Sequence, residues 1–207
     1  MKPNQTVYII DDDSDVADSM SMLLESTGLR TQQYHSAEEF LKNPIDLLMG
    51  CLILDVRMPD MNGLDLHQEI KRNNANLPVV FVTGHGDVPM AVQAMKNGAL
   101  EFLQKPFRDQ EFIDCVNRAL KANSEALSYL KRRRSIQARI DSLTKREHEI
   151  MRLIAAGNIT KAVAAKLSIS PRTVEIHRAR TMEKMQAKTL AQLVQMVVEV
   201  EHQETAG

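Results

Sequence analysis

The segment LILDVRMPDMNGLDL, residues 52–66, places an acidic residue directly after a short apolar run. The run Cys51–Leu54 has the length and composition of a buried strand, and Asp55 follows it. Further along, the stretch Gly63–Arg72 has the pattern of an amphipathic helix. The segment therefore predicts a strand, a carboxylate at the carboxyl end of that strand, and then a helix.

The alternation of strand and helix continues on both sides of this segment. Strands are expected at Thr6–Ile10, Arg30–Tyr34, Val79–Val82 and Glu101–Gln104, and helices around Val16–Leu24 and at Ala37–Lys42, Pro89–Lys96 and Asp109–Ala122. Short strands separated by such helices indicate right-handed βαβ units and a parallel sheet covered on both faces. We predict a doubly wound, flavodoxin-like α/β domain whose five strands take the common order 2-1-3-4-5. The segment Asn43–Gly50 is expected to be a loop.

Polar residues with matching chemistry follow four of the expected strands. Asp11 and Asp12 follow the first strand, and Asp55 follows the third. Thr83 and Lys105 follow the fourth and fifth strands. Ligands of an open parallel sheet bind at the carboxyl ends of its strands, and the order 2-1-3-4-5 makes strands one and three neighbours. We therefore expect these side chains to share one site.

Neighbouring carboxylates need a cation, because like charges at short range disfavour joint ionisation. Oxygen ligands and an incoming phosphoryl group favour Mg²⁺. The Asp55 carboxylate can attack phosphorus and form an aspartyl phosphate, while Lys105 and the Thr83 hydroxyl can bind the phosphate oxygens. Taken singly, an aspartate after a strand is usually a turn or helix-cap residue. Five suitable residues at successive strand ends favour the functional interpretation.

Four strings carry a resemblance to the receiver domains of two-component response regulators over roughly residues 5–122: VYIIDDD (7–13), LILDVRMPDMNGLDL (52–66), VVFVTGHGD (79–87) and EFLQKPF (101–107). The resemblance implies that Asp55 accepts a phosphoryl group from a sensor histidine kinase. It implies Mg²⁺ ligands at Asp12, Asp55 and the main-chain carbonyl of Arg57, with Asp11 assisting through water. It also implies that Thr83 and Lys105 sense the phosphate, that Phe102 is an aromatic switch and that Lys105–Pro106 is cis.

From residue 124 onward the sequence predicts helices only. Residues 123–141 are expected to be a helical linker that continues the fifth helix. Thr144 and Glu147 form a capping-box pattern at the start of a further helix. A short helix, Lys161–Leu167, is followed by a turn and by a helix that Ser170 and Pro171 begin. This arrangement resembles a helix-turn-helix, although periodicity alone fits a plain helical bundle equally well.

A second resemblance covers about residues 142–200, through LTKREHEIMRLIAAG (143–157), NITKAVAAKLSIS (158–170) and PRTVEIHRARTMEKMQAKTLAQLV (171–194). These strings are similar to the four-helix LuxR-type output domain, which binds DNA. The implied DNA contacts are Lys161, Arg172, Thr173, Glu175, Ile176, His177 and Arg178. Thr160 stands where the family usually has Asn. The final helix, Leu190–Val200, is the usual dimer contact in such domains, and its expected apolar face consists of Leu193, Met196, Val197 and Val200.

Composition agrees with a reduced, cytoplasmic protein that has no membrane segment, since no apolar run reaches the length of a spanning helix and the two cysteines lack metal or redox spacing. The net charge of −1 conceals a division, because residues 124–207 hold 15 Lys+Arg and 9 Asp+Glu of the totals of 26 and 27. The first part is therefore net −7 and the second net +6. The acidic first part would therefore suit a cation as its ligand, and the basic second part would suit a polyanion.

Together these features predict a receiver domain (residues 1–122), a helical linker (123–141) and a DNA-binding domain (142–207). The pair resembles the FixJ/NarL type of response regulator, a non-enzymatic regulator of transcription. Its expected partners are double-stranded DNA, a sensor histidine kinase, a second copy of itself upon phosphorylation, and RNA polymerase as a further candidate. The rival is a Mg²⁺-dependent phosphatase with an aspartyl nucleophile. It would need a second Asp two residues after Asp55, where this chain has Arg57.

Overall fold

The computed structural model of the chain describes residues 5–59, 61–73, 76–84 and 88–201. The elements in chain order are β1 (Thr6–Ile10), α1 (Ser14–Ser26), β2 (Thr31–Tyr34), α2 (Ala37–Leu41), the 3₁₀ helix η1 (Ile45–Leu47), β3 (Gly50–Leu54), α3 (Gly63–Asn73), β4 (Val79–Thr83), α4 (Val88–Lys96), β5 (Glu101–Gln104), α5 (Asp109–Asp141), α6 (Lys145–Ala155), α7 (Thr160–Leu167), α8 (Pro171–Lys184) and α9 (Leu190–Glu201). The chain divides into two compact units, Met1–Leu127 and Ser128–Gly207.

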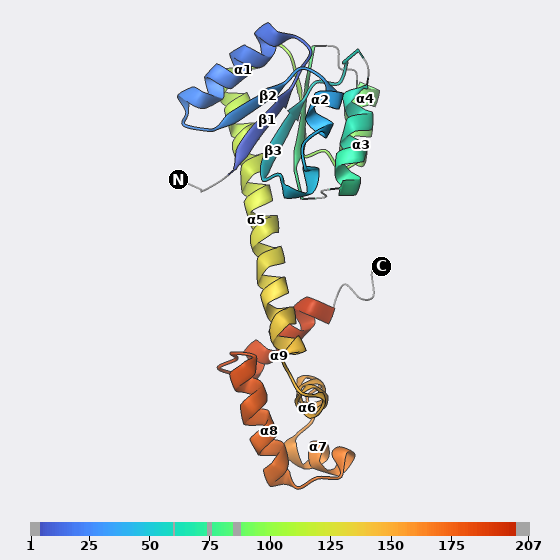
Figure 1. Cartoon of the computed structure of the whole chain (residues 1–207), viewed down its shortest axis with the longest axis vertical. Helices are drawn as coiled ribbons and strands as arrows, with labels where there is room; N and C mark the ends of the chain where they lie inside the picture. Colours follow the sequence, from blue (N-terminus) through green and yellow to red (C-terminus); the bar gives the residue numbers. More distant parts are fainter. Residues whose placement is uncertain (1–4, 60, 74–75, 85–87, 202–207) are drawn as a thin grey trace. The chain divides into compact units, whose positions relative to one another are not determined.

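The first unit contains a five-stranded parallel sheet with the order β2-β1-β3-β4-β5, which confirms the predicted fold class. Helices α1 and α5 lie on one face, and α2, α3 and α4 lie on the other (Figure 1). The alternation of side chains along β1 explains these two layers, because Val7 and Ile9 pack toward α1 and α5 while Tyr8 and Ile10 pack toward α2 and α3.

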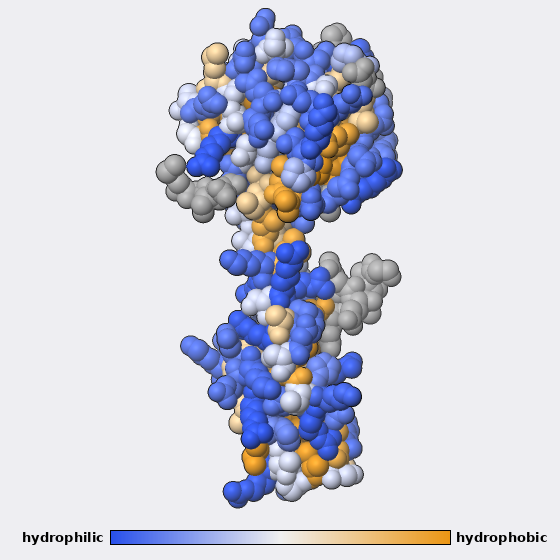
Figure 2. Space-filling view, viewed as in Figure 1, coloured by the Kyte–Doolittle hydropathy of each residue, from blue (hydrophilic) through white to orange (hydrophobic). Residues whose placement is uncertain are grey.

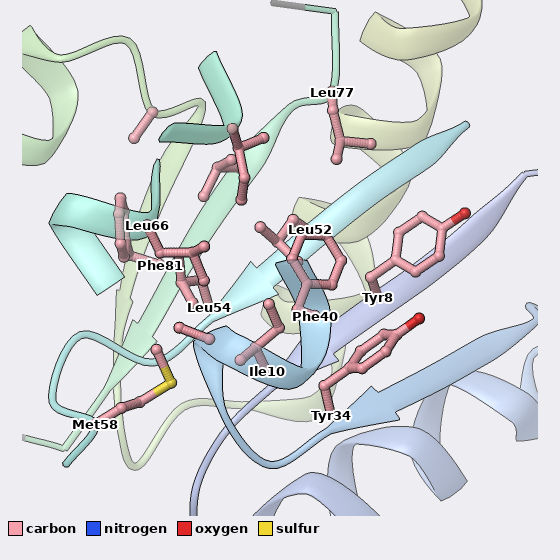
Figure 3. Close-up of a cluster of buried hydrophobic side chains, with 14 of the residues drawn as sticks. Tyr8, Ile10, Tyr34, Phe40, Leu52, Leu54, Met58, Leu66, Leu77 and Phe81 are labelled. Carbon is pink, nitrogen blue, oxygen red and sulfur yellow. The ribbon is translucent and has the colours of Figure 1, made fainter. Parts of the chain in front are cut away.

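Aromatic residues fill much of the layer between the sheet and α2–α4. Figure 3 shows Phe40 beside Tyr8 and Tyr34, and its ring meets theirs edge-on at centroid distances of 6.1 and 5.2 Å. Phe81 of β4 is also completely buried in this layer, against Leu66 of α3. Burying a side chain of this size stabilises a fold by about 1.5–3 kcal/mol. The packed sheet and helices therefore hold the strand ends, and the residues that follow them, in fixed positions.

One local feature differs from the sequence expectations, and another agrees with them. The predicted loop Asn43–Gly50 contains η1, and Ile45 is buried against the core. Helix α5 continues from Asp109 to Asp141, which confirms that residues 123–141 are helical and extend the fifth helix; it begins in the first unit and ends in the second. Within the described residues, no helix combines the length and apolar character that a membrane crossing requires.

The second unit is helical, and α7 and α8 form the expected helix-turn-helix. The left-handed residue Ser168 (φ 52°) ends α7, and the Ser170 side chain caps α8 by accepting from the Thr173 N–H. The predicted capping box of Thr144 and Glu147 begins α6. The expected core residues of α8 are also inside, since Val174, Thr181 and Met185 are fully buried and Met182 is partly buried.

The apolar face predicted on α9 packs inside the second unit. Leu193, Val197 and Val200 are buried, and Met196 is partly buried, in a cluster with Ile136 of α5 and Met185. These four residues therefore form the core-facing side of α9, and the expectation that this helix makes the dimer contact stays a prediction. The second half of α5, which the sequence suggested was a linker, covers this face.

Candidate functional site

The strand ends bring the predicted polar residues to one edge of the sheet. Asp11 follows β1, Asp55 follows β3, Thr83 ends β4, and Lys105 follows β5. The ladder continues one step past the strands, because the Asp55 N–H donates to Ile10 O (2.9 Å) and the Lys105 N–H donates to Thr83 O (2.9 Å). The backbone therefore fixes where these side chains begin.

Lys105 lies between the two buried carboxylates. Its Nζ is 2.6 Å from Asp11 Oδ2 and 3.7 Å from Asp55 Oδ1. The second oxygen of Asp55, Oδ2, accepts the Arg57 N–H at 2.7 Å, and the Thr83 hydroxyl also hydrogen-bonds this carboxyl group. Asp11, Asp55 and Thr83 are all buried. The four side chains thus form a connected polar cluster inside an apolar sheet edge.

The electrostatics of Asp55 are set by its burial. Loss of solvent raises the pKa of the Asp55 carboxyl above its ordinary value, while the Lys105 ammonium and the Arg57 N–H oppose the rise. The neighbouring Asp11 charge raises the pKa further, and the Thr83 hydroxyl lowers it. The ionised form of Asp55 is consequently less stable in the folded protein than in water, and a cation bound beside it would offset this difference.

The backbone of Asp55 lies so close to Gly63 that no side chain fits at position 63, a requirement that the sequence did not reveal. A Cβ on Gly63, the first residue of α3, would lie 2.2 Å from the carbonyl oxygen of Asp55. The Gly63 N–H donates to Val56 O at 2.9 Å, which closes the loop after Asp55. Glycine is needed here for the close approach of α3 to this loop.

The consecutive aspartates after β1 have different positions. Asp11 is buried, whereas the side chains of Asp12 and Asp13 are exposed. Asp13 is the N-cap of α1, and its side chain accepts from the N–H groups of Asp15 and Val16. Its role is therefore that of a helix cap, which its place directly before the helix pattern could have indicated.

The oxygen donors at this edge fit Mg²⁺ chemically. Among the residues that the structure describes, no three acidic, histidine or cysteine side chains converge on one point. Mg²⁺ commonly takes only one or two carboxylates and retains several waters. The pair of buried carboxylates Asp11 and Asp55 meets that requirement, while Asp12 and Arg57 are exposed beside them. The residues present thus fit the metal.

The remaining predicted receiver residues lie on β5 and directly after it. Phe102 is half-buried, and its ring centroid is 6.3 Å from that of Phe81. The Lys105–Pro106 bond is cis, as the resemblance implied. The last three residues of the 79–87 motif lie outside the described residues.

The predicted DNA-contact residues lie on α8 and α7 and differ in exposure. Arg172, Glu175 and Ile176 of α8 are exposed, as is Lys161 of α7. Thr173, His177 and Arg178 are half-buried. Hydrophilic residues dominate the visible surface of this unit (Figure 2). The N-terminal half of α8 is therefore a largely accessible surface with both charged and apolar groups.

One contact between α7 and α8 was not expected. The Thr160 hydroxyl donates to Glu175 Oε1 at 2.5 Å. Thr160 is the first residue of α7, and the preceding Ile159 provides no side-chain cap. Because the partners are 15 positions apart, only the fold reveals that Thr160 orients an exposed carboxylate of α8.

Two known families match these two units. The response regulator receiver domain matches residues 7–117, and the bacterial regulatory proteins of the luxR family match residues 141–197. Since the first match alone covers more than half of the chain, this protein belongs to the response regulators that carry a receiver domain and a LuxR-type output domain.

Individual relatives support the same assignment over both units. The transcriptional regulatory protein FixJ of Rhizobium meliloti (strain 1021) is 42% identical over 193 residues, which cover 93% of this chain and 95% of FixJ. The solved structure of the response regulator StyR has a TM-score of 0.83 and 37% identity, covering 94% of this chain and 98% of that one. Full-length FixJ from B. japonicum has a TM-score of 0.59 and 38% identity, covering 96% and 98%.

The predicted family and function class are thereby confirmed. The chain is a FixJ-like response regulator, a phosphorylation-dependent regulator of transcription. A receiver joined to a LuxR-type domain implies a histidine kinase as one partner and DNA as another. Receiver domains generally bind Mg²⁺ where they are phosphorylated.

Proposed function

We propose that Asp55 accepts the phosphoryl group and that this modification promotes dimerisation and DNA binding. The observation that carries the proposal is the meeting of Asp11, Asp55, Thr83 and Lys105 at one sheet edge. An Asp55 oxygen attacks phosphorus, and the bond from phosphorus to the kinase histidine breaks. The chain accepts a phosphoryl group but turns over no other substrate, apart from hydrolysis of its own aspartyl phosphate.

The surrounding residues divide the remaining tasks. Asp11, Asp12, Asp55 and the Arg57 carbonyl would hold Mg²⁺, which would supply positive charge to balance the phosphoryl oxygens. Lys105 can exchange its contact with Asp55 Oδ1 for a phosphate oxygen, because its Nζ is only 3.7 Å from that atom. The Thr83 hydroxyl, which already hydrogen-bonds Asp55, donates to another phosphate oxygen.

The switch acts through a two-state equilibrium that phosphate biases. Thr83 moves toward the phosphate and leaves space for Phe102, which is half-buried against Phe81 and turns inward. The exposed surface of α4 and β5 then changes shape. Because Val88, Val92 and Met95 of α4 are exposed apolar residues, we infer that this surface forms the contact between two copies.

DNA binding is assigned to the helix-turn-helix, with α8 in the major groove. Arg172 and Glu175 can address base edges, while Lys161 contacts phosphate. Thr173, Ile176, His177 and Arg178 lie close enough in sequence to complete this surface. A two-fold dimer predicts a roughly palindromic site. The setting is the cytoplasm, and RNA polymerase is a further partner of the bound dimer.

The test compares phosphorylated and unphosphorylated protein on one DNA duplex. The duplex is first selected from random sequences by the phosphorylated form. Fluorescence anisotropy then measures affinity, and sedimentation measures assembly, with Asp55→Asn as control. We expect tighter binding and a dimer only for the phosphorylated wild type. If confirmed phosphorylation changed neither the affinity for the duplex nor the oligomeric state seen by sedimentation, the proposal would be overturned.

A further inference from the structure

A cavity of about 220 Å³ lies in the first unit at the opposite edge of the sheet from Asp55. It is open at the start of β4 and β5, between the C-terminal half of α3 and helix α5. Its apolar wall includes Leu77, Leu100, Ala122 and Ala126. The phosphorylation site and the DNA-binding helices do not use this cavity.

A buried polar side chain lies in the wall of this cavity. His67 of α3 is only 4% exposed, and its Nδ1 has no hydrogen-bond partner among the described residues. The imidazole packs edge-on against Phe81, with a centroid distance of 5.5 Å. Burial lowers the pKa of His67, and the Lys71 charge lowers it further. The ring is therefore a neutral polar group in apolar surroundings, where burial without a partner is costly.

A cation lies one helical turn from this histidine. Lys71 also lines the cavity, and its Nζ donates to Asn97 O at 2.7 Å. That bond holds the ammonium in place beside Gly98, where an added Cβ would lie 3.0 Å from Nζ. An ammonium has three donors, so Lys71 retains N–H groups for a ligand.

We propose that this cavity binds a small apolar monocarboxylate. The ammonium of Lys71 matches one negative charge, and it lies next to an apolar wall against which the half-open cavity can hold a hydrocarbon group. The volume of about 220 Å³ suits an acid the size of 3-methylbutanoate or benzoate rather than a nucleotide. Lys71 sets the charge of the ligand, and the cavity volume and its apolar wall set its size.

The test is a titration of the full-length protein with benzoate and 3-methylbutanoate, followed by methyl and amide NMR. Benzyl alcohol is the matched neutral ligand. We expect saturable shifts of the Leu77 and Leu100 methyl groups with a dissociation constant of about 1 mM or below. Benzoate should bind about tenfold more tightly than benzyl alcohol, because a hydrogen bond to a charged group is the stronger one.

Three variants separate a carboxylate site from a merely apolar cavity. Lys71→Met should remove the tenfold preference, and Ala122→Leu should abolish binding by filling the cavity. Lys121→Met, an exposed lysine on the same helix as Ala122, should change neither. Unchanged shifts at the Asp55 edge would show that each variant remains folded. Absence of saturable shifts in the wild type, equal affinity for benzyl alcohol, or an unaffected Lys71→Met variant would overturn the proposal.

Discussion

Asp55 combines burial with a neighbouring carboxylate, and this combination places an ionised group where it costs stability. At neutral pH the folded state holds an ionised group whose pKa is raised, chiefly by loss of solvent. Lys105 offsets part of this cost, but it lies closer to Asp11 than to Asp55. The geometry that would suit a cation and the proposed phosphoryl group therefore lowers the free energy of unfolding of the metal-free, unphosphorylated protein.

Replacing Asp55 by Asn should stabilise the metal-free protein by about 1 kcal/mol at pH 7.5, because Asn has no charge to bury and Lys105 retains Asp11. Since the folded-state pKa is raised, wild type gains stability as pH falls through that pKa toward 3.8. The advantage of the variant should shrink over the same range. Urea unfolding at several pH values measures it, with the exposed Asp46→Asn as control. An equal gain for both variants would contradict this explanation.

Glu147 shows the opposite behaviour in the second unit. It accepts the Thr144 N–H at 2.9 Å and pairs with Lys184 Nζ at 2.7 Å, so it joins the start of α6 to the end of α8. The Lys184 hydrogen bond, followed by the Thr144 N–H, lowers its pKa from 4.5 to about 2. The carboxylate therefore favours the folded state, in contrast to Asp55.

Glu147→Gln should destabilise the second unit by about 1–2 kcal/mol at pH 7 through loss of the charged hydrogen bonds. Because the folded-state pKa is lowered, this contribution is complete above 4.5 and disappears as pH falls from 4.5 toward 2. Thermal unfolding of wild type and variant over this range measures it. Glu149→Gln, which alters an exposed pair with Arg146, should have little effect. A difference that does not decrease with acid would refute the assignment.

Sequence order predicted the residues whose positions follow from strand ends. Asp11, Asp55, Thr83 and Lys105 each follow a recognisable strand, and parallel strands end at a common edge. Gly63 was missed because its importance is a backbone distance to Asp55 that no pattern along the chain encodes. The environment of His67 and the contact of Thr160 with Glu175 were missed for the same reason, since other elements form them.

At the scale of the elements, α7 and α8 act as a pair through Thr160 and Glu175. Because Thr160 holds Glu175 Oε1, the carboxylate keeps one orientation and its other oxygen is left for the base edge that we propose it contacts. Thr160→Val should therefore reduce discrimination at one base position, by about fivefold, with little loss of overall affinity. Affinities for all single-base variants of the selected duplex measure this effect.

Lys161→Met provides the contrast to Thr160→Val. Loss of a phosphate contact should lower the affinity for every duplex by the same factor. It should also reduce the slope of log affinity against log salt concentration by about one. If Thr160→Val also weakened every duplex evenly, Thr160 would act on the stability of the helix pair and not on specificity.

Element boundaries were predictable where capping residues mark them and not where packing decides. Ser170–Pro171 and the Thr144–Glu147 box marked the starts of α8 and α6. The role of α5 beyond Ala122 could not be derived, because it depends on Ile136 meeting α9 and on Arg139 donating to Met185 O at 3.1 Å. These contacts make residues 128–141 part of the second unit.

At the scale of the whole molecule, the two units carry opposite charge and separate chemistry. The acidic first part carries the proposed cation site, and the basic second part carries the proposed DNA-binding surface. The family assignment links these parts into one regulator, and the aspartyl phosphate is the proposed input.

The most direct test of this account is the intact mass of the protein after incubation with acetyl phosphate or phosphoramidate and Mg²⁺. Wild type and Asp46→Asn should each gain a single phosphoryl group, removal of Mg²⁺ should prevent the gain, and Asp55→Asn should gain none. An adduct of equal extent on Asp55→Asn, or no adduct on folded wild type with either donor, would contradict the assignment of Asp55 as the phosphoacceptor.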